Sequence, residues 1–344
     1  MVTMRAAVFR GLGQVEVTDV PRPEPGEGEV LIHVAYCGLC GSDLEAYHTG
    51  MYEPGLIIGH EFAGTVAGLG PGVTGWEVGD RAVVDDAIPC GQCPPCREGH
   101  PDACSALTLI GVTHDGALAE YVRTAARGLQ RVPAGITLRQ AALVEPLSVA
   151  LHGVRRSRLK VGDRALVMGA GPIGLLTLQC ALLAGARAVV VTEIDPARAA
   201  LAARLGAAAV LNPLRDNVGV ALSGLTGGQG PDVIYICTGA RVPYRDAVSL
   251  VRKGGQVFII GLCTEPVEAD FMTVVLSELS IEGSFAGRAE VSAAVDLIAQ
   301  RRVDVESLIS NEILLDEVVE QGFKRLDTPG SGAVKVLVRV GGEK

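Results

Sequence analysis

The feature that most constrains the fold is a glycine-rich turn between an apolar strand-like run and an apolar helical run. Gly169-Ala-Gly171-Pro172-Ile173-Gly174 follows RALVM and opens the segment IGLLTLQCALLAGA. Strand, tight turn and helix in this order predict the start of a dinucleotide-binding βαβ unit. Gly169 permits the turn, Gly171 lets a pyrophosphate approach the backbone, and Gly174 lets the helix pack closely on the strand.

An acidic residue, Glu193, ends the next predicted strand, AVVVTE. There it can accept hydrogen bonds from the adenosine ribose and repel a 2′-phosphate, which predicts NAD rather than NADP. Asp195 competes for this role but is better placed to cap the helix DPARAALAARLG. Arg198 is either a cover for the adenine or an ordinary exposed arginine. The alternative is a glycine turn without a dinucleotide, as in a methyltransferase.

The rest of the chain shows two different patterns of predicted secondary structure. From about residue 159 strand segments (RALVMGAG, AVVVTE, AVLNP, DVIYICTG, GQVFIIG and SIEGSF) are separated mostly by helical ones. This alternation predicts an α/β fold with a parallel sheet covered on both faces, because parallel neighbours need crossover connections. Thr238 and Gly261, which follow two of these strands, complete the predicted cofactor site. Residues 8–122 instead read as short β-strands separated by Pro and Gly, and AVKVLVRV near the C-terminus returns to a strand pattern.

Four cysteines form the strongest local signal. Two residues separate Cys90 from Cys93 and Cys93 from Cys96, and seven more precede Cys104. Four thiolates at short intervals can surround Zn²⁺ completely, as a structural zinc site requires. An iron–sulfur cluster is the alternative, since the same ligands suit both.

A dispersed second set combines thiolate, imidazole and carboxylate. Cys40 follows the strand-like run EVLIHVAY, His60 lies in GHE, and Glu145 lies in LVEPLSVALHG. Three such ligands leave a fourth position open for water or substrate, which is typical of a catalytic zinc.

Taken together, the sequence resembles the zinc-containing medium-chain dehydrogenases, especially their sorbitol, butanediol and threonine dehydrogenase branch. The motifs CGLCGSD, GHEFAGTV, VGDRAVV, CGQCPPCREGHPDAC, EPLSVALHG and GAGPIG occur in the family's order over nearly the whole chain. The resemblance implies a GroES-like catalytic domain over 1–152 and 289–344, with a structural-zinc lobe at 88–105. It also implies an inserted Rossmann NAD-binding domain over 153–288.

The resemblance also assigns roles. Cys40 and His60 become catalytic zinc ligands, and Asp43 orients His60 from behind. Glu61 and Glu145 are alternative or exchanging carboxylate ligands. Ser42 becomes the first proton relay. The expected reaction is hydride transfer from an alcohol to nicotinamide in the cleft between the domains, with two zinc ions per chain.

The outer relay departs from the family pattern. Glu45 stands where the family often has a histidine, and His48 is nearby but shifted. Glu45 could carry the proton, bind a polar substrate or simply face water, and the solvated role is slightly favoured because a surface acid needs no special explanation. Ala286 follows Phe285 where sorbitol dehydrogenases often carry arginine, so a polyol, a vicinal diol, an amino alcohol such as threonine and a cyclic secondary alcohol all remain open.

The composition of the chain limits the kinds of partner that it is expected to bind. The net charge of -9 disfavours nucleic acid and anionic membranes, because phosphate binding needs Lys and Arg patches. The N-terminal segment does not read as a signal peptide, and glycines interrupt the uncharged run 165–186, so a cytoplasmic protein is expected. The resemblance implies a homodimer or homotetramer. A zinc-free quinone reductase would lack both metal sets. An NAD- and zinc-binding redox sensor is the non-enzymatic alternative.

Overall fold

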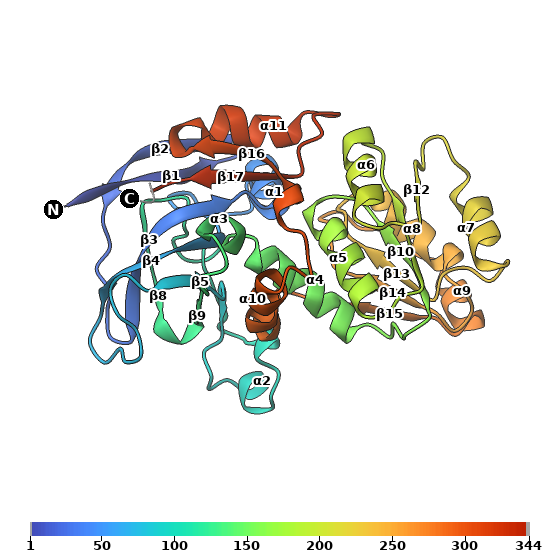
Figure 1. Ribbon diagram of the computed structural model, residues 1–344, viewed down its shortest axis with the longest axis horizontal. Coiled ribbons are helices and arrows are strands. Elements are labelled where there is room, and N and C mark those ends of the chain that lie inside the picture. Colours follow the sequence, from blue (N-terminus) through green and yellow to red (C-terminus); the bar gives the residue numbers. More distant parts are fainter. Residues whose placement is uncertain (1, 342–344) are drawn as a thin grey trace. The chain divides into compact units, whose positions relative to one another are not determined.

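The computed structural model describes residues 2–341. Contacts divide this chain into two compact units (Figure 1). A β-rich unit comprises residues 2–145, 291–301 and 309–341, and an α/β unit comprises Pro146–Glu290 and Arg302–Leu308. The domain boundaries expected from the sequence stay a prediction.

The α/β unit is built on one parallel sheet of six strands. Its order is β12-β11-β10-β13-β14-β15, the doubly wound order in which the first strand lies centrally. The strands are β10 (Arg164–Met168), β11 (Ala188–Thr192), β12 (Ala209–Leu211), β13 (Val233–Ile236), β14 (Gln256–Ile259) and β15 (Ser280–Gly283). Every predicted strand of this region is present, and the α/β class is confirmed.

One helix precedes β10, and the others connect successive strands of the sheet. They are α4 (Val144–Arg156), α5 (Pro172–Leu183), α6 (Pro196–Arg204), α7 (Val218–Thr226), α8 (Arg241–Leu250) and α9 (Phe271–Leu276). The uncharged run 165–186 is strand β10 followed by helix α5. In the described part of the chain no helix combines the length and apolarity needed to span a bilayer.

The β-rich unit has a mixed sheet in the order β16-β17-β3-β4-β5-β9, with β8 also paired to β3. These strands are β3 (Glu29–Gly38), β4 (Glu61–Leu69), β5 (Arg81–Val84), β8 (Tyr121–Ala125), β9 (Leu129–Arg131), β16 (Ile309–Leu314) and β17 (Lys335–Arg339). Strand β3 is central and buried along most of its length, as its apolar sequence requires.

Smaller elements complete this unit. Two hairpin-like pairs are β1 (Thr3–Gly11) with β2 (Gln14–Pro21), and β6 (Ala87–Ile88) with β7 (Thr108–Leu109). The helices are α1 (Gly41–Thr49), α2 (Pro94–Arg97), α3 (Leu138–Ala141), α10 (Val291–Ala299) and α11 (Lys324–Asp327), with a π-helix, η6, at Val318–Phe323.

Candidate active site

Strand register brings distant residues to one edge of the β-rich sheet. Gly38, at the end of β3, pairs with Glu61, the first residue of β4. Gly38 also pairs with Leu337 of β17, which runs antiparallel to β3. The end of β3 therefore lies beside the starts of β4 and β17, and Cys40, two residues past β3, falls at the same edge.

Three of the predicted ligands meet there. The ligand atoms of Cys40, His60 and Glu61 all lie within 4.8 Å of one another. Cys40 is the N-cap of α1, and its N–H donates to Asp43 Oδ2 at 3.1 Å. Thiolate, imidazole and carboxylate in this cluster suit Zn²⁺, and three protein ligands keep one position open.

Asp43 lies behind His60, as the resemblance implies, but at ion-pair rather than hydrogen-bond distance. Asp43 Oδ1 is 3.7 Å from His60 Nδ1, and both buried atoms have no hydrogen-bond partner among the described residues. Burial opposes charge on the imidazole. The carboxylate of Asp43 and the thiol of Cys40 outweigh that effect and raise the pKa of His60 well above its ordinary value.

Glu61 has a second, cationic partner. Lys335 Nζ donates to Glu61 Oε1 at 2.7 Å, to Glu61 Oε2 at 2.5 Å and to the carbonyl of Leu39 at 2.9 Å. The ammonium neutralises the one carboxylate that lies within the ligand cluster. Glu61 is thus held by a buried ion pair while its oxygens stay close to Cys40 and His60.

Glu145 lies in the first turn of α4 and outside the three-residue cluster. Burial, followed by the carboxylate of Asp86, raises its pKa well above the ordinary value, and His60 opposes that rise. Glu145 therefore shares the electrostatic environment of the cluster. The choice between Glu61 and Glu145 as zinc ligand stays a prediction.

The residues proposed to move the proton lie on α1 and the following turn. Ser42 is half-buried in the first turn of α1. Tyr52 is 5% exposed, its hydroxyl has no hydrogen-bond partner among the described residues, and burial followed by the charge of Asp43 raises its pKa. His48 is exposed and pairs with Asp327 at 3.0 Å. The ion pair of His48 with Asp327 disfavours it as the outer relay. Glu45 is half-buried.

The four lobe cysteines also converge. The ligand atoms of Cys90, Cys93, Cys96 and Cys104 lie within 4.8 Å of one another. Cys93 caps α2, Cys104 ends the short 3₁₀ turn Pro101–Ala103, and strands β6 and β7 close the base of the lobe. Four thiols without a competing side chain in the cluster fit a closed, structural zinc site.

Backbone N–H groups prepare these sulfurs for a metal. Cys90 Sγ accepts from the N–H of Cys93 at 3.4 Å, and Cys104 Sγ accepts from the N–H of Cys90 at 3.3 Å. Hydrogen bonds from the N–H groups of Cys96 and Ser105 lower the pKa of Cys93 to about 6. A thiolate is the form that binds metal, so these hydrogen bonds favour Cys93 as the first sulfur of the cluster to ionise, whereas burial and the neighbouring Cys93 raise the pKa of Cys96 to about 12.

The glycine turn of the α/β unit has the conformation expected for it. Gly169 has φ +101°, in the region that favours glycine. A Cβ on Gly174 would overlap the carbonyl oxygen of Gly169, whereas a Cβ on Gly171 would meet open space. Gly171 is the N-cap of α5 and Pro172 its first residue. Open space in front of a helix N-terminus suits a phosphate.

Glu193 directly follows β11 and is 8% exposed. Its Oε2 accepts from the N–H of Ala170 at 2.7 Å, and its Oε1 accepts from the N–H groups of Ile194 and Asp195 at 2.8 Å each. The carboxylate therefore ties the end of β11 to the glycine turn. Asp195 caps α6 by accepting from Ala197 and Arg198, as predicted.

The remaining predicted cofactor residues lie beside this turn or at the start of α6. A Cβ on Gly169 would lie 3.1 Å from Cβ of Thr238, and a Cβ on Gly261 would contact the backbone of Thr238. Arg198 lies in the first turn of α6. Gly169, Thr238 and Gly261 thus gather at the carboxyl ends of β10, β13 and β14, where doubly wound sheets bind ligands.

Comparison with known proteins agrees with this arrangement. Residues 26–134 match the family model of the alcohol dehydrogenase GroES-like domain, and residues 172–300 match that of the zinc-binding dehydrogenases. The chain is 34% identical to the 2-dehydro-3-deoxy-L-galactonate 5-dehydrogenase of Pseudoalteromonas atlantica over 99% of this chain and 100% of that protein. It belongs to the zinc-binding alcohol dehydrogenase family.

Other relatives and solved structures also match this dehydrogenase over nearly its whole length. The sorbitol dehydrogenase of Bacillus subtilis is 30% identical, with 97% of each chain covered. The crystal structure of 2R,3R-butanediol dehydrogenase from Bacillus subtilis has a TM-score of 0.89 at 31% identity, covering 98% of this chain and 99% of that one. A Sinorhizobium meliloti structure described as a zinc-binding dehydrogenase bound to NADP has a TM-score of 0.92 at 34% identity, covering 98% and 100%.

Family membership confirms the predicted fold class, a GroES-like domain with a dinucleotide-binding domain, and the enzyme class, a zinc-dependent oxidoreductase that uses a nicotinamide dinucleotide. The non-enzymatic redox sensor and the zinc-free reductase are thereby disfavoured. The sequence patterns did not point to three residues that lie near the candidate ligands, namely Lys335, Asp86 and Tyr52. For Lys335 and Asp86 the only available signal was a charged residue beside an apolar strand.

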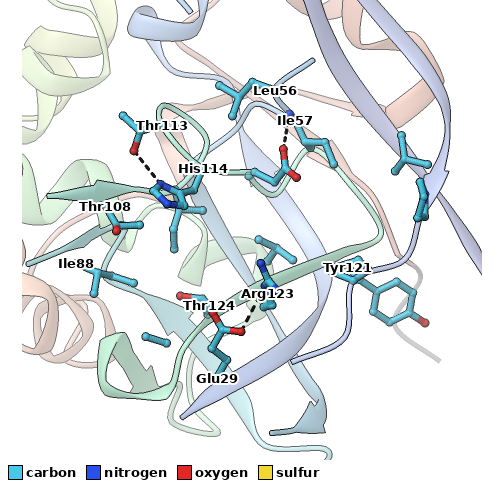
Figure 2. A pocket seen from close by; sticks show the side chains of 18 of the residues that line it. Glu29, Leu56, Ile57, Ile88, Thr108, Thr113, His114, Tyr121, Arg123 and Thr124 are labelled. Atoms are coloured by element: carbon cyan, nitrogen blue, oxygen red, sulfur yellow. Dashed lines mark hydrogen bonds and ion pairs between the residues drawn. The ribbon is translucent and has the colours of Figure 1, made fainter. Parts of the chain in front are cut away.

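A separate cavity of this dehydrogenase, of about 970 Å³, lies in the β-rich unit (Figure 2). None of the predicted ligands is among its described lining residues. Its polar groups pair with one another: Arg123 lies 3.4 Å from Glu29, and Thr113 Oγ1 lies 3.1 Å from His114 Nδ1 (Figure 2). The cavity is therefore no part of the candidate active site.

Proposed function

We propose that this enzyme oxidises secondary alcohols that carry a neighbouring polar group, with NAD as hydride acceptor. The meeting of Cys40, His60 and Glu61 at one sheet edge carries the proposal. The names of relatives that act on sorbitol, butanediol and L-arabinitol support it. An amino alcohol of the threonine type or a cyclic secondary alcohol is the alternative substrate.

The reaction takes a hydride from the carbinol carbon and a proton from the hydroxyl, giving a ketone, NADH and H⁺. Cys40, His60 and either Glu61 or Glu145 would hold the catalytic zinc. When bound, zinc supplies a Lewis acid that lowers the pKa of the substrate hydroxyl. Ser42 accepts the proton first, and Tyr52 packs beside it; Asp43 keeps the His60 ring in place.

We propose NAD rather than NADP because of Glu193. Its buried carboxylate is held next to the glycine turn by three backbone N–H groups. A fixed negative charge at this place would repel a 2′-phosphate. Gly169, Gly171 and Gly174 would cradle the pyrophosphate at the start of α5, with Thr238 and Gly261 beside it.

One set of measurements tests this function. Elemental analysis is expected to find two zinc ions per chain, and NADH absorbance should rise with polyols, diols, hydroxy-amino acids or cyclic alcohols. Cys40→Ser should abolish turnover and leave NADH binding intact. A single zinc, or loss of NADH binding in Cys40→Ser, would show that the metal site is misassigned.

We also propose a homodimer or homotetramer in the cytoplasm. Helix α9 exposes Phe271, Met272, Val275 and Leu276 by 70–73%, beside the edge strand β15. Apolar clusters of this kind mark interfaces. None of the nine cysteines, all of which lie in the described part of the chain, forms a disulfide, as suits a reducing compartment. Light scattering would measure the oligomer, and a monomer would contradict it.

A further inference from the structure

Asp86 lies next to the metal ligands although it is distant from them in sequence. Strand β5 pairs with β4 antiparallel, with Ala63 opposite Val83. His60 directly precedes β4 and Asp86 follows β5 by two residues, so this pairing brings both to the same end of the two strands. The N–H of Ile110 donates to the carbonyl of Asp86 at 3.0 Å, which fixes this turn of the backbone.

The Asp86 side chain is buried among charged groups of the active site. It is 9% exposed. Burial raises its pKa, while His60 lowers it and Glu61 raises it further. Asp86 is also the strongest charged influence on Glu145. Asp86 and Glu145 therefore form a pair of buried carboxylates beside the Cys40 and His60 cluster.

These carboxylates give the site more acidic than basic groups, and burial together with their mutual repulsion raises the pKa of Asp43, Asp86 and Glu145. Cys40, Asp43, Glu61, Asp86 and Glu145 supply five acidic groups, against the ammonium of Lys335 and one divalent ion. Lys335 donates a hydrogen bond to Glu61, so its positive charge mainly compensates that carboxylate. Buried charges are stabilised by partners that donate hydrogen bonds or carry the opposite charge.

We propose that Asp86 is a specificity-determining residue that accepts a hydrogen bond from a hydroxyl or ammonium group on the carbon next to the reacting carbinol. A carboxylate at that carbon is repelled, so 2-hydroxy acids are excluded as substrates. This inference rests on the proposed function and adds the substrate class to it: neutral diols and cationic amino alcohols.

A matched panel of secondary alcohols tests it: 2,3-butanediol, 3-amino-2-butanol, 2-butanol and 2-hydroxybutanoate. The wild type should prefer the first two over 2-butanol and should use 2-hydroxybutanoate least. Asp86→Asn should lower kcat/KM about tenfold or more for the diol and the amino alcohol, because the charged acceptor is replaced by a neutral amide oxygen. The activity on 2-butanol should stay within about threefold, and 2-hydroxybutanoate should improve. Calorimetric binding of the diol to the zinc-loaded enzyme with NADH should weaken in parallel.

Asp85→Asn is the matched control. It makes the same change one residue away, where the carboxylate instead accepts from the N–H of Ala87 at 3.2 Å. It should leave the preference unchanged, and both variants should keep two zinc ions. An equal loss on all four alcohols in Asp86→Asn, or a wild type that prefers 2-hydroxybutanoate, overturns the role of Asp86. A wild type that oxidises no alcohol of any class overturns the proposed function instead. The relative loss on diol against amino alcohol tells which donor Asp86 binds.

Discussion

The ammonium of Lys335 donates to both carboxylate oxygens of Glu61, at 2.7 and 2.5 Å, with the two side chains only 1% and 2% exposed. The pair joins the first residue of β17 to the first residue of β4. It holds Glu61 beside Cys40 and His60 while compensating its charge. Because removal of one partner leaves a buried charge, this pair is more sensitive to single than to double substitution.

Lys335→Met should therefore destabilise the enzyme by ~3–5 kcal/mol, since Glu61 would keep an uncompensated buried charge. Glu61→Gln combined with Lys335→Met should recover much of that loss. Urea unfolding of the zinc-loaded protein measures both free energies of unfolding. A double variant no more stable than Lys335→Met would contradict the pairing.

The second and third glycines of the turn, Gly171 and Gly174, should respond differently to substitution by alanine. Gly174→Ala should lower the free energy of unfolding by ~1–3 kcal/mol, because its Cβ would overlap the carbonyl of Gly169. Gly171→Ala should leave stability nearly unchanged, since its Cβ meets open space, yet weaken NADH binding about tenfold or more. Thermal unfolding and NADH fluorescence titration separate these effects. If Gly171→Ala and wild type bind NADH with equal affinity, the phosphates of the cofactor do not lie at this turn.

Zinc in the lobe should be lost on acidification. The folded state lowers the pKa of Cys93 from 9.0 to about 6, so this thiolate favours the folded lobe above pH 9. That contribution falls as the pH drops from 9 and is gone below about 6, where the thiol is protonated. Zinc release to a colorimetric chelator should thus rise steeply below about pH 6. Cys263→Ser, outside the lobe, should give the same curve as wild type, and a pH-independent release would contradict the cysteine site.

Glu193→Ala should shift cofactor preference and stability together. Preference for NADH over NADPH should fall about tenfold or more, because the charge facing the 2′-phosphate is gone. Stability should drop by ~1–3 kcal/mol, since Ala170, Ile194 and Asp195 lose the acceptor of their N–H groups. Fluorescence titrations with both cofactors measure the ratio. If the ratio stays constant, another residue discriminates.

The parts of the site that were predictable depend on short-range patterns. All four lobe cysteines lie between Cys90 and Cys104, so one loop brings them together whatever the rest of the chain does. The glycine turn joins β10 to α5 directly, and the acid after β11 follows one crossover later. The periodicity of strands and helices was enough to place these motifs on a parallel sheet.

Only the tertiary structure decided which distant charges surround the catalytic ligands. The sequence by itself predicted the fold class, the glycine turn and two sets of candidate metal ligands. It did not pair Lys335 with Glu61 or bring Asp86 next to His60, because those meetings depend on the register of β17 with β3 and of β5 with β4. Register is set by the packing of whole strands, and a one-residue shift of β17 or β4 would turn Lys335 or Glu61 to the opposite face of the sheet.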